Sequence, residues 1–198
     1  AENGIGDGDL GRSRQDLNNF YSNEYAEEYR KKQGGDAVNV GSQGSGLDDS
    51  AALLQDQYIV KNRHVLGSKG MLDAADDQSS YSKTHGQVHP QMRNGMEKYR
   101  YSDILLVDSG TGRVVYSVAK EVDFGTSLTD GPYAASGLAE AFRRANTASA
   151  DATALVDFGK YRPSYDEPES FMAAPIFEGR ERIGVLVVQV PLDRLPPL

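Results

Sequence analysis

The chain has 198 residues, with 21 Lys and Arg against 29 Asp and Glu, which gives a formal net charge of −8 at pH 7. This acidic balance argues against a protein that binds nucleic acid through its phosphates, because such proteins need clustered positive charge. The lack of cysteine excludes disulfides, thiol nucleophiles and cysteine-based metal centres. The longest apolar run, residues 183–188, is far shorter than the ~20 residues that cross a bilayer. Since the sequence starts at Ala1 without an apolar leader, we expect that any signal segment or membrane anchor has been removed.

The N-terminal half predicts three helices after a short unfolded end. Residues 1–11 carry too few apolar groups to fold. Residues 12–32, 51–58 and 81–99 then repeat apolar or aromatic side chains at steps of three and four, the spacing of one helix face. The positions are Leu17, Phe20, Tyr21, Tyr25 and Tyr29 in the first helix, Ala51, Leu54 and Tyr58 in the second, and Tyr81, His85, Val88, His89, Met92, Met96 and Tyr99 in the third.

Polar and glycine-rich segments separate these helices. Residues 33–46 predict a mobile loop, because they are rich in Gly and polar side chains. Residues 48–50 and 76–80 offer the Asp and Ser side chains that cap helix N-termini. Pro90 lies inside the third helix and predicts a kink, because proline lacks an amide N–H. We therefore treat residues 12–99 as a helical part.

From residue 100 onward the apolar pattern changes to alternation, which is typical of strands. The connections are short and favour antiparallel neighbours. We expect an α+β fold in which the N-terminal helices pack with a five-stranded antiparallel sheet, residues 100–198 forming one structural unit with the helices. The expected strands are residues 102–108 and 113–120, joined as a hairpin, and residues 154–158, 171–177 and 182–190, with a helix at 134–145.

Four segments in this order carry a resemblance to a known family: residues 64–85, 101–128, 131–142 and 171–195. The last is the most specific, with a small-residue strand containing Pro, a tight turn, Ile-Gly-Val-Leu and an apolar strand ending at Asp-Arg. Together they resemble the Cache or PAS-like extracytoplasmic sensor domains of methyl-accepting chemotaxis proteins, some nucleotide cyclases and sensor kinases. The resemblance covers about residues 58–194 and says little about residues 1–57.

The resemblance implies a PAS-like sheet that cups a small ligand, in a receptor anchored in the inner membrane with this domain in the periplasm or outside the cell. Among such receptors, the resemblance favours a methyl-accepting chemotaxis protein. The alternatives are the sensor domain of a nucleotide cyclase or histidine kinase, and a cytosolic PAS-like module that holds a cofactor or a partner helix. We also expect a homodimer through the N-terminal helices, although the stripe of Phe20, Tyr21 and Tyr25 equally suits an intramolecular core.

A ligand pocket needs an apolar wall and a few orienting polar groups. Asp157 stands among apolar strand residues, so its carboxylate needs a partner or water, but it equally suits a loop cap. For Tyr116, filling the core beneath the helices is the more frequent role, and Lys120, next to Glu121, also suits a solvated edge. The predicted ligand-binding residues are Tyr101, Tyr116, Lys120, Asp123, Tyr133, Asp157, Tyr165, Phe171 and Ala173.

Catalytic and metal chemistry find less support. His85 and His89 are four residues apart, a spacing that can bind one metal, but the Glu of the metalloprotease pattern is missing between them. Packing inside the helix stripe explains both histidines more simply. The acidic group at residues 73–77 lacks a calcium-loop spacing, and neither a nucleophile elbow nor a phosphate-binding loop is present. We expect no enzyme activity, no cofactor, no bound metal and no nucleic-acid partner.

Overall fold

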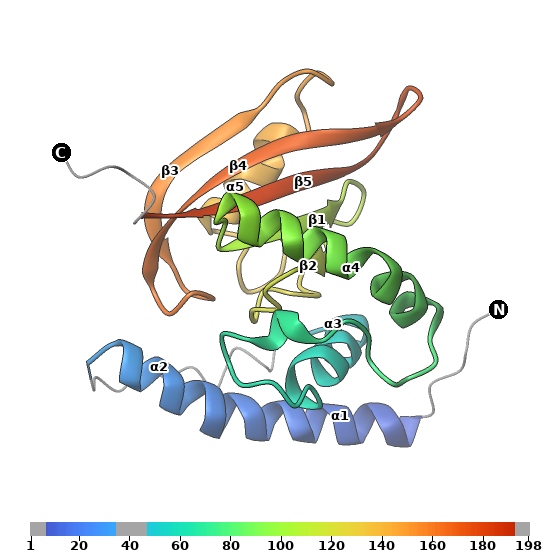
Figure 1. The fold of residues 1–198 in the computed structure, drawn as a ribbon, viewed down its shortest axis with the longest axis vertical. Helices are drawn as coiled ribbons and strands as arrows, with labels where there is room; N and C mark the ends of the chain where they lie inside the picture. The colour runs from blue at the N-terminus through green and yellow to red at the C-terminus, as the bar shows by residue number, and fades with distance from the viewer. Residues whose placement is uncertain (1–6, 35–46, 193–198) are drawn as a thin grey trace.

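A computed structural model describes residues 7–34 and 47–192 of the chain. Helices form one side of the molecule and a twisted sheet forms the other (Figure 1). The unfolded end expected at residues 1–11 lies partly outside the described residues, as does most of the loop expected at 33–46. Within the described ranges, no helix combines the length and apolar character needed to cross a membrane.

The N-terminal segment forms one long helix along the edge of the molecule (Figure 1). It consists of α1 (Asp7–Phe20), a π-helical turn η1 (Tyr21–Tyr25) and α2 (Ala26–Lys32). The helix begins five residues earlier than expected. Its aromatic stripe lies inside the chain's own core, because Phe20, Tyr21, Tyr25 and Tyr29 are all at most 4% exposed. The stripe is therefore an intramolecular contact and not an outer face.

Shorter helices lie between the long helix and the sheet. Helix α3 (Asp49–Gln55) begins where the Asp48 carboxylate accepts a hydrogen bond from the Ala51 amide (2.9 Å), as its capping side chain predicted. A second π-helical turn, η3 (Asp56–Val60), continues α3, and a short 3₁₀ turn, η4 (Lys69–Met71), follows.

Helix α4 (Ser80–Tyr99) crosses in front of the sheet in Figure 1, and the Ser79 hydroxyl caps its first turn. His85 and His89 are buried as expected, but Val88 and Tyr99 are 43% and 51% exposed. The stripe predicted for this helix was too wide. Because α4 packs on one face of β1, β2 and β5 and is open on its other side, the outer parts of the stripe face solvent.

The C-terminal half forms a five-stranded sheet in the order β2-β1-β5-β4-β3, with every neighbouring pair antiparallel. This confirms the predicted α+β fold with helices and a five-stranded antiparallel sheet. Three strands are longer than expected, and the helix before them starts three residues later, after its capping Ser136. The elements are β1 (Asp103–Asp108), β2 (Val114–Ser117), α5 (Gly137–Ala145), β3 (Ala154–Tyr161), β4 (Glu167–Glu178) and β5 (Glu181–Pro191).

The two faces of the sheet pack against different helices, because alternate residues of a strand point to opposite faces. One face joins the main core with α5 and the N-terminal helices, and the other packs against α4 in a smaller cluster. The main-core face carries Leu105, Val107, Val185 and Val187, and the α4 face carries Ile104, Leu106, Leu186 and Val188.

Strand β2 is shorter than the predicted 113–120, and a buried carboxylate explains why. Asp103, at the start of β1, accepts hydrogen bonds from the amides of Val118 and Ala119, each at 2.8 Å. Its other oxygen accepts one from the Ser117 hydroxyl at 2.6 Å. The Ala119 amide is thereby withdrawn from the β ladder, whereas the Val118 amide still also donates to the Ile104 carbonyl oxygen of β1 at 3.1 Å. The chain then turns away toward the helices at Lys120, which has a left-handed backbone (φ +59°).

The helices are tied to the segment after β2 by one buried amide. Gln55 donates from Nε2 to the carbonyl oxygens of Val122 (2.8 Å) and Phe124 (2.9 Å), and its Oε1 accepts from the Tyr21 hydroxyl (2.7 Å). The side chain is fully buried. One residue therefore joins the long helix, α3 and the loop that leads into α5.

We expect Gln55→Ala to lower the free energy of unfolding by about 3 kcal/mol or more, because it leaves a hydroxyl and two carbonyl groups buried without partners. Urea denaturation followed by circular dichroism measures the loss. Gln57→Ala, which removes a half-buried amide from the next turn, is the control and should change stability by about 0.5 kcal/mol. Equal losses in the two variants would contradict the role assigned to Gln55.

Candidate functional site

A cavity of about 120 Å³ lies between the helices and the end of the sheet where β1 begins. Its walls combine aromatic, apolar and charged side chains, half of them buried. We call it the inner cavity. It is lined by Tyr25, Ile59, Leu66, Gly67, Lys69, Ser102, Ala119, Lys120, Glu121, Val122, Pro163 and Tyr165.

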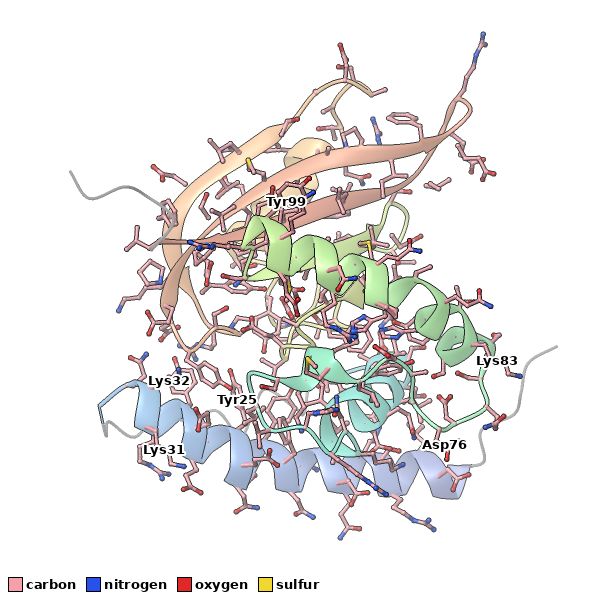
Figure 2. All side chains as sticks on the ribbon, in the orientation of Figure 1. Tyr25, Lys31, Lys32, Asp76, Lys83 and Tyr99 are labelled. Atoms are coloured by element: carbon pink, nitrogen blue, oxygen red, sulfur yellow. The ribbon has the colours of Figure 1, made fainter. Side chains whose placement is uncertain are left out.

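Both π-helical turns contribute a side chain to the inner cavity. Tyr25 ends η1 and Ile59 lies in η3. A π turn holds an extra residue and so changes the direction of the side chains that follow. Tyr25 extends from the long helix toward the loops at the sheet end (Figure 2). Its hydroxyl donates to the carbonyl oxygen of Arg162 at 3.2 Å.

Lys120 reaches the cavity wall from the turn after β2. Its ammonium donates to the carbonyl oxygen of Ser117 and lies over three rings, with Nζ 4.7 Å from the centre of Tyr116, 4.9 Å from Phe124 and 5.4 Å from Tyr58. Burial lowers the pKa of Lys120 to about 7, and the negative charge of Asp103 offsets part of that effect. With 2% exposure, Lys120 is not the solvated edge charge that its neighbour Glu121 suggested.

Four carboxyl groups lie close to one another at this end of the sheet, and the charge of one of them, Asp103, acts on Lys120. Asp103 and Asp123 are fully buried, Glu169 is 5% exposed, and Glu121 is half-buried at the cavity wall. Burial raises the pKa of Asp123 to about 7, with the Asp103 charge adding to it and the Tyr161 hydroxyl opposing it. Burial and the charges of Asp123 and Asp103 also raise the pKa of Glu121 well above its ordinary value.

The histidine pair lies behind Lys120 on α4. The rings of His85 and His89 stack with their centres 4.3 Å apart. His85 Nδ1 donates to the Asp73 carbonyl oxygen (2.6 Å), and His89 bridges the Tyr116 hydroxyl and the Gly70 carbonyl oxygen. Burial lowers their pKa values to about 3 and 4. Among the described residues, no group of three or more His, Cys, Asp or Glu is placed to hold a metal ion.

A larger and more open groove, of about 470 Å³, lies on the other side of the loop at residues 162–166. Pro163 lines both the groove and the inner cavity. The loop contains two residues with left-handed backbones, Tyr165 (φ +57°) and Asp166 (φ +59°), conformations that cost energy outside glycine. The groove is lined by Pro132, Tyr133, Ala135, Ser136, Lys160, Arg162, Pro163 and Asp166.

Side chains of the long helix hold this loop in place. The Tyr29 hydroxyl donates to the Asp166 carboxylate at 2.5 Å, and the Gln33 amide donates to the Tyr165 carbonyl oxygen. The Tyr165 ring packs against Tyr25, with ring centres 5.5 Å apart. The loop therefore connects the cavity wall directly to α2.

The structure brings together some of the predicted ligand-binding residues. Lys120 and Tyr165 line the inner cavity, and Tyr133 lines the larger groove on the other side of the loop at residues 162–166. Asp123 is one of the four clustered carboxylic acids, and the ring of Tyr116 packs against the Lys120 ammonium.

The other predicted positions lie elsewhere. Asp157 is exposed on β3, on the same face as the exposed Leu155, and its carboxylate accepts from the Phe158 amide at 2.7 Å. Phe171 and Ala173 are 1% exposed in the main core, and Phe171 packs against Tyr161. The small Ala173 is thus part of a filled core and lines none of the cavities described here. Tyr101 packs in the α4 cluster.

Several cavity residues were missed by the sequence reasoning. Glu121 was considered only as a neighbour of Lys120, and its burial depends on the turn that Asp103 sets. Lys69 lies between Gly67 and Gly70 in a loop without periodicity, yet it is 3% exposed because its ammonium donates to the Asn62 carbonyl oxygen at 2.9 Å. Its one local signal was a single charge in a glycine-rich loop.

Comparison with known proteins gives a fold likeness at low identity. No protein-family model and no curated protein matches the chain. Among solved structures, the V. cholerae histidine kinase DctB sensor domain is similar, with 16% identity, a TM-score of 0.42, and coverage of 85% of this chain and 57% of that one. The extracellular domain of the putative histidine kinase vpHK1S-Z8 is similar with 14% identity, a TM-score of 0.41, and coverage of 93% and 59%. The chain thus spans less than three fifths of either structure.

The raised pKa of Asp123 predicts a pH-dependent stability. The folded state keeps the proton up to about pH 7 and the unfolded state loses it near pH 4. The stabilisation is therefore complete at low pH and is lost as the pH rises through 7. Between pH 8 and pH 6 we expect the free energy of unfolding of the wild type to rise relative to Asp123→Asn by about 1.4 kcal/mol, the equivalent of one pKa unit.

Urea denaturation of both proteins at pH 8 and pH 6 measures this difference. Because His85 and His89 are present in both, their opposite dependence cancels in the comparison: their lowered pKa values give stability that is present above pH 6.5 and lost as the pH falls. Parallel pH profiles for the two proteins would show that Asp123 does not hold a proton in the folded state.

Proposed function

We propose that the chain is the small-molecule-sensing domain of a bacterial transmembrane receptor, placed outside the cytoplasmic membrane. The observation that carries the proposal is the inner cavity, where buried charged side chains meet between the helices and the sheet end. A purely structural core would exclude such charges, because burying them is unfavourable unless a partner compensates. The family resemblance of residues 58–194 supplies the receptor context. In this proposal the domain binds its ligand without converting it.

Signal transfer would run through the loop at residues 162–166. A ligand in the inner cavity contacts Tyr25, Pro163 or Tyr165 directly, and the same loop is held by Tyr29 and Gln33 of the long helix. A ligand that prefers one arrangement of loop and helix shifts the population toward it by the difference in its affinities, typically ~1–3 kcal/mol. The output would be a small displacement of the long helix.

The class of receptor, and with it the output module that the sensing domain controls, is assigned separately. A chemotaxis receptor is our first assignment, with a nucleotide cyclase or a histidine kinase as alternatives and a cytosolic PAS-like module as the runner-up. The full-length gene separates the membrane receptors from the cytosolic module, because a receptor requires two apolar runs of ~20 residues flanking this region. If the domain dimerises through its N-terminal helices, it must use their polar outer side, since the aromatic stripe is buried within the chain.

A thermal-shift screen of amino acids, organic acids, amines, sugars and nucleosides tests the sensing function. A ligand at 100 times its Kd stabilises the folded state by ~2.7 kcal/mol, which raises Tm by about 5–10 °C for a chain of this size. Ala119→Leu should abolish the shift, because the larger side chain fills the inner cavity without changing a charge. Asp157→Ala should leave it intact, since Asp157 is exposed and distant from the cavity wall. A full shift in Ala119→Leu would place the ligand elsewhere.

A further inference from the structure

Carboxyl groups outnumber ammonium groups around the inner cavity, where the wall carries only two lysines, Lys69 and Lys120. Asp103, Glu121, Asp123 and Glu169 lie close enough for their charges to influence one another. Within the described parts of the chain, Asp103, Glu121 and Asp123 make no ion pair of 4.0 Å or less with a lysine or arginine. The ammonium group of Lys120 is bound to a carbonyl oxygen and lies over three rings. The carboxyl groups therefore have no cationic partner among the described side chains within ion-pair distance, and a bound cation would supply one.

The same region has buried acceptors without donors. Asp123 Oδ1 and Gln189 Oε1 are buried and accept no hydrogen bond from the described residues. Gln189 donates from Nε2 to the Ser164 hydroxyl, and Ser164 donates to Glu121, each at 2.8 Å. The Gln189 amide and the Ser164 hydroxyl thus donate in series toward the Glu121 carboxylate, which can accept further hydrogen bonds. Buried acceptors left without donors are rare and call for an explanation.

The cavity wall offers a carboxylate beside aromatic rings. Glu121 and Ser102 line one part, and the Ser102 hydroxyl lies 3.2 Å from both carboxylate oxygens of Glu169. Tyr25, seen in Figure 2 extending from the long helix, and Tyr165 line another part. An ammonium group has three donors and no acceptor, and it is attracted both to carboxylates and to the faces of aromatic rings. This wall is complementary to such a group.

We propose that the inner cavity binds a small organic ammonium ion whose charged group pairs with Glu121; this rests on the sensing function proposed above. A cavity of about 120 Å³ has room for about four water molecules at ~30 Å³ each, so the ligand has only a few non-hydrogen atoms. An anionic ligand would add a further negative charge beside the carboxyl groups. The lysines at the wall, Lys69 and Lys120, already donate to carbonyl oxygens.

Three probes of one size test the charge that the cavity selects: propylammonium, 1-propanol and propionate, each titrated calorimetrically into the full 198-residue chain. We expect propylammonium to bind at least tenfold more tightly than either of the others. Because a bound cation lowers the raised pKa of Glu121, binding at pH 7 should release protons. Titrations in two buffers of different ionisation enthalpy measure that release.

Glu121→Gln keeps the shape of the side chain and removes its charge, so it should weaken propylammonium binding at least tenfold. Glu167→Gln makes the same change at an exposed position near the start of β4 and should leave binding unchanged. If Glu121→Gln does not fold, Ala119→Leu and the proton release of the wild type decide the point. Equal affinity of Glu121→Gln and wild type would overturn the proposal.

The outcomes separate this inference from the sensing function. Binding of propionate in preference to propylammonium would overturn the ammonium assignment and leave a sensor of carboxylates. Binding only of a neutral compound from the wider screen would do the same. If no compound of either set binds, both the ammonium assignment and the sensing function fail.

Discussion

The arrangement of this protein depends on the buried side-chain amide of Gln55. Its oxygen and its nitrogen both form hydrogen bonds, and these bonds join α3 to the long helix and to the loop after β2. Gln55 accepts from Tyr21 in the long helix and donates to the carbonyl oxygens of Val122 and Phe124. Apolar packing alone would tolerate sliding of the helices over the sheet, since it has little directional preference. A fully satisfied buried polar group allows one register only. The inner cavity exists because this register places the helices against the sheet end.

The polar groups of the core are separated from its apolar groups in space. The face of the sheet under α5 is a dry core of aliphatic and aromatic side chains, including Phe171 and Ala173. The carboxyl groups gather instead at one end of the sheet, beside Lys120. A ligand site over the middle of the sheet would require removing packed side chains. The end of the sheet already offers charge and space, and for that reason it is the better candidate.

The long helix contributes to the site and leads away from it. Its π-helical turn η1 ends at Tyr25 in the cavity wall, and α2 then contacts the loop at residues 162–166 through Tyr29 and Gln33. The loop has two left-handed residues, so its conformation is maintained by these contacts and not by local preference. An element that is locally strained and held from one side is suited to respond to a small change in the cavity.

The sequence by itself determined the elements and the fold class, because helices and strands leave periods of 3.6 and 2 in the apolar pattern. It also identified Lys120 and Tyr165 at the cavity. Only the tertiary structure decided burial. Asp157 has apolar neighbours in sequence yet faces solvent, because its face of β3, shared with the exposed Leu155, is uncovered. Glu121 sits next to a lysine yet turns inward because Asp103 ends β2. Periodicity is a local property of the chain. Whether a charge is solvated depends on segments tens of residues away, such as Ser164 beside Glu121, and no local pattern records them.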